Sequence, residues 1–144
     1  MLTELLKRGV RFVVVGGFAV RAHGYLRPVE DLDLLVETTE QNLRELREAL
    51  FTVGADKPDL IVEHLSKPKA KVIWRDVEFF SSMCGLPFDA VYKAAVYQQL
   101  SNGQVLVMSR PHLIEAKRYA QQADDRGPKA NQDREDLLWL IDQR

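Results

Sequence analysis

An apolar run that ends in two adjacent glycines restricts the fold of this sequence more than any other feature. Residues 10–15 are almost all apolar, which predicts a buried strand. Gly16 and Gly17 follow directly, and the next residues, up to Gly24, have the pattern of a short helix. A glycine turn between a strand and a helix exposes backbone N–H groups that favour an anion. The sequence therefore predicts a phosphate-binding turn.

A pair of aspartates opens the second apolar run. Asp31 and Asp33 begin a predicted strand over 31–36. Because alternate side chains of a strand lie on one face, the two carboxylates would project together, roughly 7 Å apart. Aspartate is uncommon in strands, and neighbouring carboxylates are typical ligands of a divalent cation. A metal site beside a phosphate site indicates a nucleoside triphosphate. The alternative is an edge strand that presents both aspartates to water.

Together these residues resemble the DNA polymerase β-type nucleotidyltransferase superfamily. Its pattern is an apolar residue, two glycines or Gly-Ser, a gap, and then Asp, an apolar residue and Asp or Glu. Residues 15–17 and 31–33 match this pattern. The gap contains His23 and Arg27, as in the bacterial minimal and abortive-infection-type toxin nucleotidyltransferases, although Val29 replaces their usual threonine. The resemblance implies transfer of a nucleoside monophosphate to an acceptor hydroxyl, with Mg²⁺ or Mn²⁺ as cofactor.

The resemblance also implies a third metal-binding carboxylate on a neighbouring strand. Glu78 is the best candidate, because it lies in the apolar run 77–80, where an unpartnered charge is costly to bury. The family usually has aspartate there, and Asp76 is the second choice. An exposed carboxylate on an edge strand is the alternative explanation of Glu78. The expected catalytic and metal-binding residues are therefore Asp31, Asp33 and Glu78.

Four residues are expected to contact the nucleotide, namely Gly16, Gly17, Arg27 and Lys117. Arg27 comes shortly before the aspartates, and it either reaches the triphosphate or forms a surface ion pair with Glu30. Lys117 belongs to a Leu-Ile-x-x-Lys pattern that the resembling bacterial proteins have in the helix after their last strand. There it would neutralise phosphate charge, and a solvated helix lysine is the alternative.

Charged residues near the C-terminus extend the resemblance. The bacterial proteins continue with an arginine, a lysine and two aspartates three residues apart, which resemble Arg126, Lys129, Asp133 and Asp136. Asp133 would otherwise only complement the dipole of the last predicted helix. His23 is interpreted as a packing residue, because the metal mechanism needs no histidine base.

The remaining apolar patterns predict an α/β domain. Helices are expected over 2–6, 39–51, 88–94, from Ser109 and from about Asn131, and strands over 60–62, 72–74, 77–80 and 104–108. Residues 124–130 are expected to link the last two helices. This order predicts a single domain over residues 1–144, with a small mixed β-sheet, helices packed against it and a C-terminal helical pair.

Basic residues form one local cluster, which contains Lys67, Lys69, Lys71 and Arg75 with Trp74 beside it. Such a strip suits a nucleic-acid backbone or a second phosphate group. Lysines that protect an edge strand from aggregation are the other explanation. The formal net charge of −1 predicts no broad basic surface.

Length and composition also indicate the number of domains and the cellular compartment. A chain of 144 residues suits one domain. The single cysteine, Cys84, excludes an intrachain disulfide and a multi-cysteine zinc cluster, which fits a reducing cytoplasm. Its thiol is expected to be buried and inert. The sequence shows no signal-peptide pattern and no apolar run long enough to span a bilayer. We therefore expect a cytoplasmic protein with no membrane partner.

Two classes of function fit these observations. The first is a magnesium-dependent nucleotidyltransferase that acts on a tRNA end or a protein side chain, in a toxin–antitoxin system with a cognate partner. The second is a catalytically silent nucleotidyltransferase fold that serves as a binding or regulatory module. Two features favour this class, namely Glu78 in place of the usual aspartate and the lack of an acceptor-binding domain. An antibiotic-modifying enzyme would share the first chemistry but would need an acidic pocket for a cationic drug.

Overall fold

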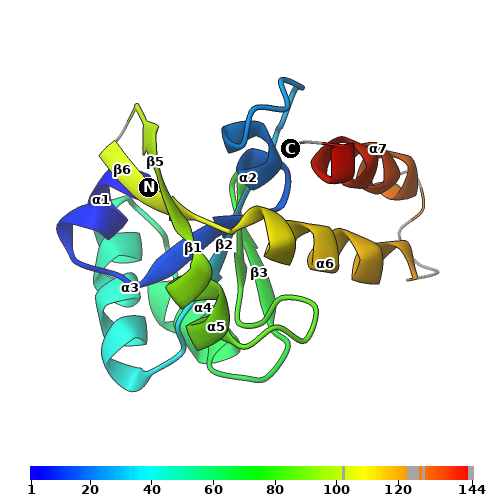
Figure 1. Cartoon of the computed structure of the whole chain (residues 1–144). Coiled ribbons are helices and arrows are strands. Elements are labelled where there is room, and N and C mark those ends of the chain that lie inside the picture. The colour runs from blue at the N-terminus through cyan, green and yellow to red at the C-terminus, as the bar shows by residue number, and fades with distance from the viewer. Residues whose placement is uncertain (102, 123–126, 128, 143–144) are drawn as a thin grey trace.

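A mixed β-sheet forms the centre of the molecule (Figure 1). The computed structural model describes residues 1–101, 103–122, 127 and 129–142. Within them, six strands are ordered β3-β4-β2-β1-β6-β5. Their bounds are β1 (Phe12–Val15), β2 (Leu32–Val36), β3 (Lys71–Trp74), β4 (Val77–Phe80), β5 (Val96–Leu100) and β6 (Gly103–Val107). Because β2 pairs antiparallel with β1 and parallel with β4, it is an interior strand of the sheet.

Helices pack in two groups around this sheet. Their bounds are α1 (Leu2–Lys7), α2 (Gly16–Ala22), α3 (Glu40–Thr52), α4 (Pro58–Leu65), α5 (Phe88–Ala94), α6 (Arg110–Gln121) and α7 (Lys129–Asp142). On the left of Figure 1, α3 packs against both α1 and α4, and on the right α2, α6 and α7 contact one another. The expected α/β class, with a mixed sheet and a C-terminal helical pair, is confirmed.

The core is centred on β1 and β2. All four residues of β1 are buried, which means that both faces of the sheet are covered there, since successive side chains of a strand point to opposite faces. Leu34, Leu35 and Val36 of β2 are fully buried beside them. Each such aliphatic side chain contributes about 1.5–3 kcal/mol of hydrophobic stabilisation. This packing fixes the positions of the residues at the ends of both strands.

Side-chain caps explain why two helix starts were predictable. The hydroxyl of Thr39 accepts a hydrogen bond from the backbone N–H of Asn42 at the start of α3, at 3.3 Å. The hydroxyl of Ser109 accepts one from the backbone N–H of His112 at the start of α6, also at 3.3 Å. Each cap satisfies a backbone donor that the first helical turn leaves without a partner.

Residues 60–62, predicted as a strand, are helical and belong to α4. Pro58 lies in the first turn of α4, where its fixed φ favours a helix. Pro58 and Leu65 are buried, whereas the exposed residues of the helix are Asp59, Leu60, Glu63 and His64. A helix buries residues at this spacing on one face. The short apolar run therefore follows the period of a helix and not the alternation of a strand.

Other differences concern the C-terminal half. β5 was not predicted, because its residues are exposed or half-buried at the edge of the sheet, where it pairs antiparallel with β6. α7 begins at Lys129, slightly before the expected Asn131. Of the expected linker over 124–130, residues 124–126 and 128 lie outside the described residues.

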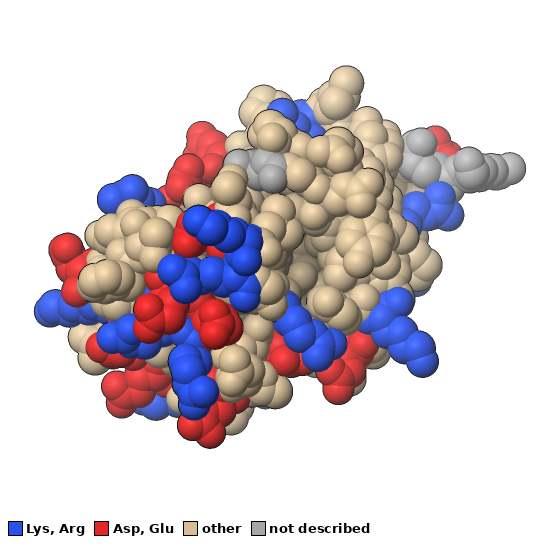
Figure 2. Space-filling view, turned by 90° about the vertical axis from the view of Figure 1, so that its left-hand side faces the viewer, with Lys and Arg blue, Asp and Glu red and all other residues tan. Residues whose placement is uncertain are grey.

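The surface over α1 and α3 carries charges of both signs. Figure 2 shows acidic and basic side chains intermingled on one part of this face, beside a largely uncharged area. Ion pairs between Arg8 and Glu4, at 3.0 Å, and between Arg44 and Glu40, at 3.4 Å, contribute to this pattern. Exposed pairs of this kind stabilise a fold little. None of the helices in the described part of the chain has the length and apolar character needed to cross a membrane.

Asn42 joins α3 to the ends of two strands. Its Oδ1 accepts a hydrogen bond from the backbone N–H of Arg11, before β1, at 2.7 Å. Its Nδ2 donates to the carbonyl of Arg11 at 3.0 Å and to that of Glu37, after β2, at 2.7 Å. The residue is 5% exposed. Asn42 is thus a buried side chain that satisfies three backbone groups at the partly buried ends of β1 and β2.

Replacing Asn42 should destabilise the fold. Asn42→Ala removes three partly buried hydrogen bonds, although the carbonyl of Arg11 keeps the one from the backbone N–H of Glu37, so we expect the free energy of unfolding in urea to fall by about 1–3 kcal/mol. The matched control is Gln41→Ala, at the exposed neighbouring position of α3, which should change that free energy by less than about 0.5 kcal/mol. Equal losses in the two variants would contradict the role given to Asn42.

Candidate functional site

Two of the predicted carboxylates lie side by side at one end of the sheet. β2 and β4 pair in parallel, and their register sets Asp33 directly beside Glu78. On its other side, β2 pairs with β1, and Asp33 lies opposite Val15. Val15 is the last residue of β1 and precedes Gly16. The strand register thus brings the glycine turn and two carboxylates to the same place.

Asp33 lies in an unfavourable environment for a charged carboxylate. Its Oδ1 is buried and has no hydrogen-bond partner among the described residues. Burial, the negative charge of Glu78, a hydrogen bond with Glu78 and the charge of Asp31 together raise the pKa of Asp33 to about 7, against a lowering by Lys129. A cation is a chemically suitable partner for such a group, because it would neutralise the charge and use the free oxygen.

Glu78 is buried inside the sheet. Its strand, β4, lies between β3 and β2, and the residue is 8% exposed. The alternative explanation, an exposed carboxylate on an edge strand, is therefore wrong. The Nζ of Lys71 lies 3.5 Å from the Oε2 of Glu78. Asp76, the second choice, is an exposed residue of the turn between β3 and β4.

Asp31 precedes β2 and is exposed, whereas it was expected inside the strand. β2 is an interior strand, so exposure on a sheet edge does not explain Asp33. Among the described residues, no three His, Cys, Asp or Glu side chains stand as a group that could hold a metal ion. Asp33 and Glu78 have the oxygen donors that Mg²⁺ prefers, and the contribution of Asp31 stays a prediction.

The two glycines leave room for side chains of the site. Gly16 has a φ of +66°, and a Cβ at this position would overlap the Oδ2 of Asp33. A Cβ at Gly17 would lie 2.8 Å from the Nη2 of Arg27 and 3.2 Å from Val29. Gly16 is therefore favoured by its positive φ and by the closeness of Asp33, and Gly17 by the closeness of Arg27 and Val29. A phosphate-binding role of the turn stays a prediction.

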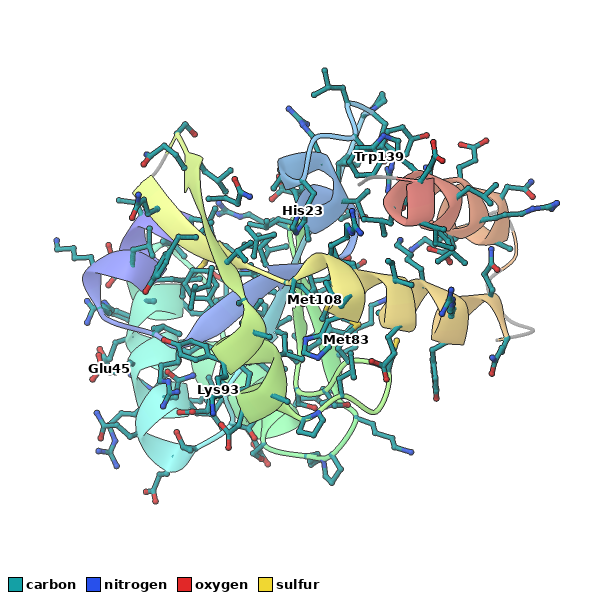
Figure 3. All side chains as sticks on the ribbon, viewed as in Figure 1. His23, Glu45, Met83, Lys93, Met108 and Trp139 are labelled. Atoms are coloured by element: carbon teal, nitrogen blue, oxygen red, sulfur yellow. The ribbon has the colours of Figure 1, made fainter. Side chains whose placement is uncertain are left out.

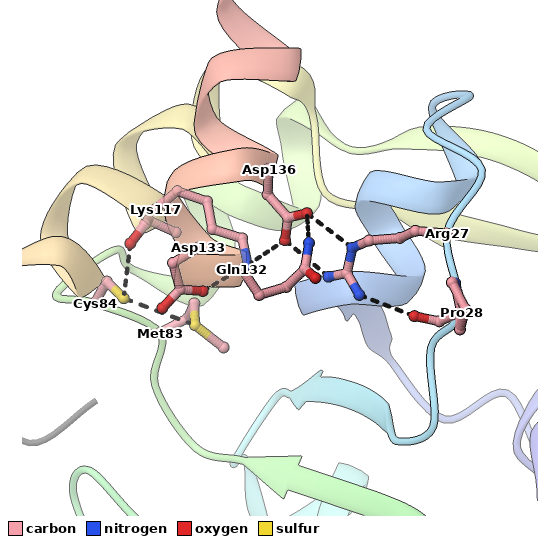
Figure 4. A network of polar contacts seen from close by, with 9 residues as sticks. Arg27, Pro28, Met83, Cys84, Lys117, Gln132, Asp133 and Asp136 are labelled. Atoms are coloured by element: carbon pink, nitrogen blue, oxygen red, sulfur yellow. Dashed lines mark hydrogen bonds and ion pairs between the residues drawn. The ribbon is translucent and has the colours of Figure 1, made fainter. Parts of the chain in front are cut away.

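Arg27 is bound to the C-terminal helix (Figure 4). Its Nε and Nη2 donate to Oδ1 and Oδ2 of Asp136 in α7, both at 2.8 Å, and its Nη1 donates to the carbonyl of Pro28 at 3.0 Å. This two-pronged geometry is the strong form of an arginine–carboxylate pair. Arg27 was expected either to reach the triphosphate or to form a surface ion pair with Glu30. The structure pairs it with Asp136 instead of Glu30, and contact with the triphosphate stays a prediction.

Lys117 belongs to the same network. Its Nζ lies 2.9 Å from Oδ1 of Asp133 and 2.9 Å from Oδ2 of Asp136 (Figure 4). Lys117 is 8% exposed, so the alternative of a solvated helix lysine is wrong. Asp133 is buried in an ion pair and does more than complement a helix dipole. Arg126, which also resembled a family residue, lies outside the described residues.

Asp136 remains charged despite its burial. Burial alone raises the pKa of this carboxyl, but the hydrogen bonds from Arg27 and the charge and hydrogen bond of Lys117 outweigh that effect. Gln132 adds a further hydrogen bond to Oδ1, at 2.9 Å. Together these contacts hold the pKa of Asp136 below its ordinary value. The pairing of Arg27 with Asp136 was not predicted, because no sequence pattern links positions so far apart.

One pocket of about 530 Å³ collects the predicted site residues. Its lining includes all seven of them, namely Gly16, Gly17, Arg27, Asp31, Asp33, Glu78 and Lys117. Lys129, Gln132 and Asp133 of α7 complete the wall near the C-terminus. The volume falls in the range of small-molecule sites. The pocket therefore combines carboxylates, cations and a glycine turn around one space.

Two other residues considered in the sequence take different positions. His23, at the end of α2, has its Nε2 2.8 Å from the carbonyl oxygen of Met108, and Figure 3 shows the two residues near each other. This contact agrees with a packing role. Cys84 is half-buried and lines the pocket, with its Sγ 3.7 Å from the carbonyl of Ala116, so the expectation of a buried thiol is only partly met.

Comparison with models of known protein families finds none that matches this sequence, and comparison with curated proteins finds no significant match. The function of the site is therefore inferred from its own geometry and chemistry. The likeness to nucleotidyltransferases rests on the motif residues described above.

The raised pKa of Asp33 predicts a loss of stability as the pH rises. Between 3.8, its value in the unfolded chain, and about 7, the folded protein keeps a proton that the unfolded chain has released. The free energy of unfolding therefore decreases through this range. Asp33→Asn removes the titration, so the variant should exceed the wild type by about 1–3 kcal/mol at pH 8 and match it near pH 4. Urea denaturation across this pH range tests the prediction, and a pH-independent difference would contradict it.

Breaking the Arg27–Asp136 pair should be costly. Asp136→Asn leaves Arg27 and Lys117 buried with one negative charge fewer, and we expect the free energy of unfolding to fall by about 3–5 kcal/mol. Glu135→Gln changes an exposed carboxylate on the same helix and should cost less than about 0.5 kcal/mol. The comparison uses chemical denaturation at pH 7. A small effect of Asp136→Asn would show that the network adds little to stability.

Proposed function

We propose that this protein is a metal-dependent nucleotidyltransferase, which transfers a nucleoside monophosphate from a nucleoside triphosphate to an acceptor hydroxyl and releases pyrophosphate. One observation carries the proposal. The residues that the sequence motif names for metal and nucleotide come from distant parts of the chain, and all of them line a single pocket. A chance likeness in sequence would not require this convergence.

Asp33 and Glu78, together with Asp31, are the proposed holders of Mg²⁺ or Mn²⁺. The fit is supported by the free, buried Oδ1 of Asp33 and by its raised pKa, which a cation would lower again. When bound, the metal supplies a Lewis acid that activates the acceptor hydroxyl and neutralises charge at the α-phosphate. The protein's own contribution is to hold these carboxylates at fixed register positions of a rigid sheet.

Arg27 and Lys117 are proposed to contact the triphosphate with the donors that they have left. A guanidinium has five N–H donors, and the contacts of Arg27 with Asp136 and Pro28 use three of them. An ammonium has three, and Lys117 uses two. In this proposal Asp136 is a positioning residue, because it fixes the direction of both cations. The glycine turn lets Asp33 and Arg27 approach the backbone closely, and its N–H groups are proposed to contact phosphate oxygens beside them.

The acceptor is not determined by this pocket. A tRNA end or a protein side chain, and a cognate toxin or antitoxin partner, follow from the family resemblance alone. An antibiotic acceptor would require an acidic pocket. This pocket mixes both signs, because Lys71, Lys117 and Lys129 line it together with the carboxylates. The cationic-drug function is therefore disfavoured.

A catalytically silent binding module is the second candidate, and one contact favours it. The ammonium of Lys71 lies 3.5 Å from Glu78 and so provides a positive charge where a metal ligand is proposed. In a silent module this lysine would replace the metal as the partner of Glu78. The two candidates differ in whether the nucleotide binds in a metal-dependent manner.

Calorimetric titration with each nucleoside triphosphate, with and without Mg²⁺, tests the proposal. Asp33→Asn keeps the shape of the side chain but removes a metal-binding charge, and it should reduce Mg²⁺-dependent binding and transfer of a labelled nucleotide at least about 100-fold, by loss of about 3 kcal/mol. Asp89→Asn, an exposed change at the start of α5, should leave both unchanged.

The outcomes separate the candidates. Binding that needs both Mg²⁺ and Asp33 supports the nucleotidyltransferase. Binding that is equal in the wild type and in both variants rules out the proposed metal site. Nucleotide binding that is independent of Mg²⁺, without transfer to RNA or protein, supports the silent module.

A further inference from the structure

A second pocket, of about 520 Å³, adjoins the first and has a different charge. It is lined by Lys67, Lys69 and Lys71, and by hydroxyl groups that include those of Ser81 and Ser82. No Asp or Glu is among the described residues that line it. We call this site the lysine pocket. Lys71 pairs with Glu78, which lies outside this wall, whereas Lys67 and Lys69 form no ion pair among the described residues, and their charge makes the pocket suited to an anion.

The two pockets have wall residues in common. Lys71, Phe80, Ser82 and Cys84 line both of them. Lys71 reaches toward the first pocket, because its Nζ is 3.5 Å from Glu78. A ligand that fills the lysine pocket would therefore lie next to the carboxylates. This position suits an acceptor better than the triphosphate, for which the glycine turn, Arg27 and Lys117 line the first pocket.

Hydrogen bonds hold the loop that carries the lysines. The hydroxyl of Ser81 accepts from the backbone N–H of Ala70 at 2.7 Å and donates to the carbonyl of Lys67 at 3.1 Å. The backbone N–H of Ser81 donates to the carbonyl of Ala70 at 3.0 Å. The loop is thus fixed to the end of β4, so the lysine backbone does not have to be ordered when a ligand binds.

Protection of a sheet edge explains only one of these lysines, because β3 is an edge strand of the sheet and Lys71 alone belongs to it. Lys67 and Lys69 lie in the loop before this strand. Both are exposed, and neither forms an ion pair among the described residues. Arg75, the fourth member of the expected cluster, lies in the turn after β3, with its guanidinium 4.5 Å from the ring centre of Trp74.

We propose that the lysine pocket binds the phosphate backbone of a single-stranded nucleic acid, which is the acceptor in the proposed transfer. Lysines at positions 67, 69 and 71 place several cations along one pocket, which suits the repeated phosphates of a strand. Tyr119, which is 57% exposed, and Phe80 add aromatic rings to the wall, and bases stack on such rings. The acceptor role rests on the proposed nucleotidyltransferase function, whereas binding of the strand does not.

The test is fluorescence anisotropy with labelled single-stranded RNA and DNA of roughly 12 nucleotides, titrated with the whole protein over a range of salt concentrations. Lys67→Gln/Lys69→Gln should weaken binding at least about tenfold at low salt. It should also reduce the slope of log K against log salt by about 1.4, because each phosphate contact on a single strand contributes about 0.7. Glutamine keeps the Cβ at Lys69, whose φ is +55°, so the loop strain is unchanged.

The matched control is Lys7→Gln/Lys93→Gln, which removes two exposed lysines from the last turns of α1 and α5. Equal weakening in the two double variants, or no binding by the wild type, overturns the proposal. Weaker binding of inorganic triphosphate with unchanged binding of the strand also overturns it, because the pocket would then belong to the nucleotide. Binding of the strand is measured without metal or nucleotide, so its outcome is separate from failure of the proposed chemistry.

Discussion

The parallel pairing of β2 with β4 is the constraint on which the site depends. It puts the carboxyl groups of Asp33 and Glu78 at neighbouring register positions inside a sheet. Burial of the carboxyl, followed by repulsion from Glu78 where little water screens the charges, raises the pKa of Asp33 to about 7. The hydrophobic core around Leu34 and Leu35 prevents the strands from moving apart to relieve this repulsion. The sheet therefore stores an unfavourable charge arrangement that a cation would relieve.

The C-terminal helix completes the site by holding its cations. Asp136 of α7 binds both Arg27, from the loop before β2, and Lys117 of α6. These three residues belong to segments far apart in the chain, so the charges balance only after α6 and α7 have packed beside α2. The last helix therefore has to be in place for the wall of the pocket to be complete.

The sequence predicted local structure well where a short-range cause operates. The glycine turn, the strand before it and the helices that begin after Thr39 and Ser109 were identified from apolar period and capping residues. It failed at residues 60–62, because a short apolar run fits a strand or a helix equally well, and at β5, whose exposed residues have little apolar pattern. For the site, the motif named residues that line one pocket. Their partners were not predictable, because those contacts depend on how α7 packs.

Lys71 gives the two pockets a shared electrostatic element. Its ammonium pairs with Glu78 and also lines the lysine pocket, so its charge is divided between them. Any ligand that neutralises Glu78 releases this ammonium toward the neighbouring pocket, and any anion there draws it away from Glu78. Thermodynamic linkage makes the effect reciprocal, with each occupant changing the affinity for the other by the same factor. Positive cooperativity between the proposed cation at the carboxylates and the proposed anion at the lysines would follow from the position of this one side chain.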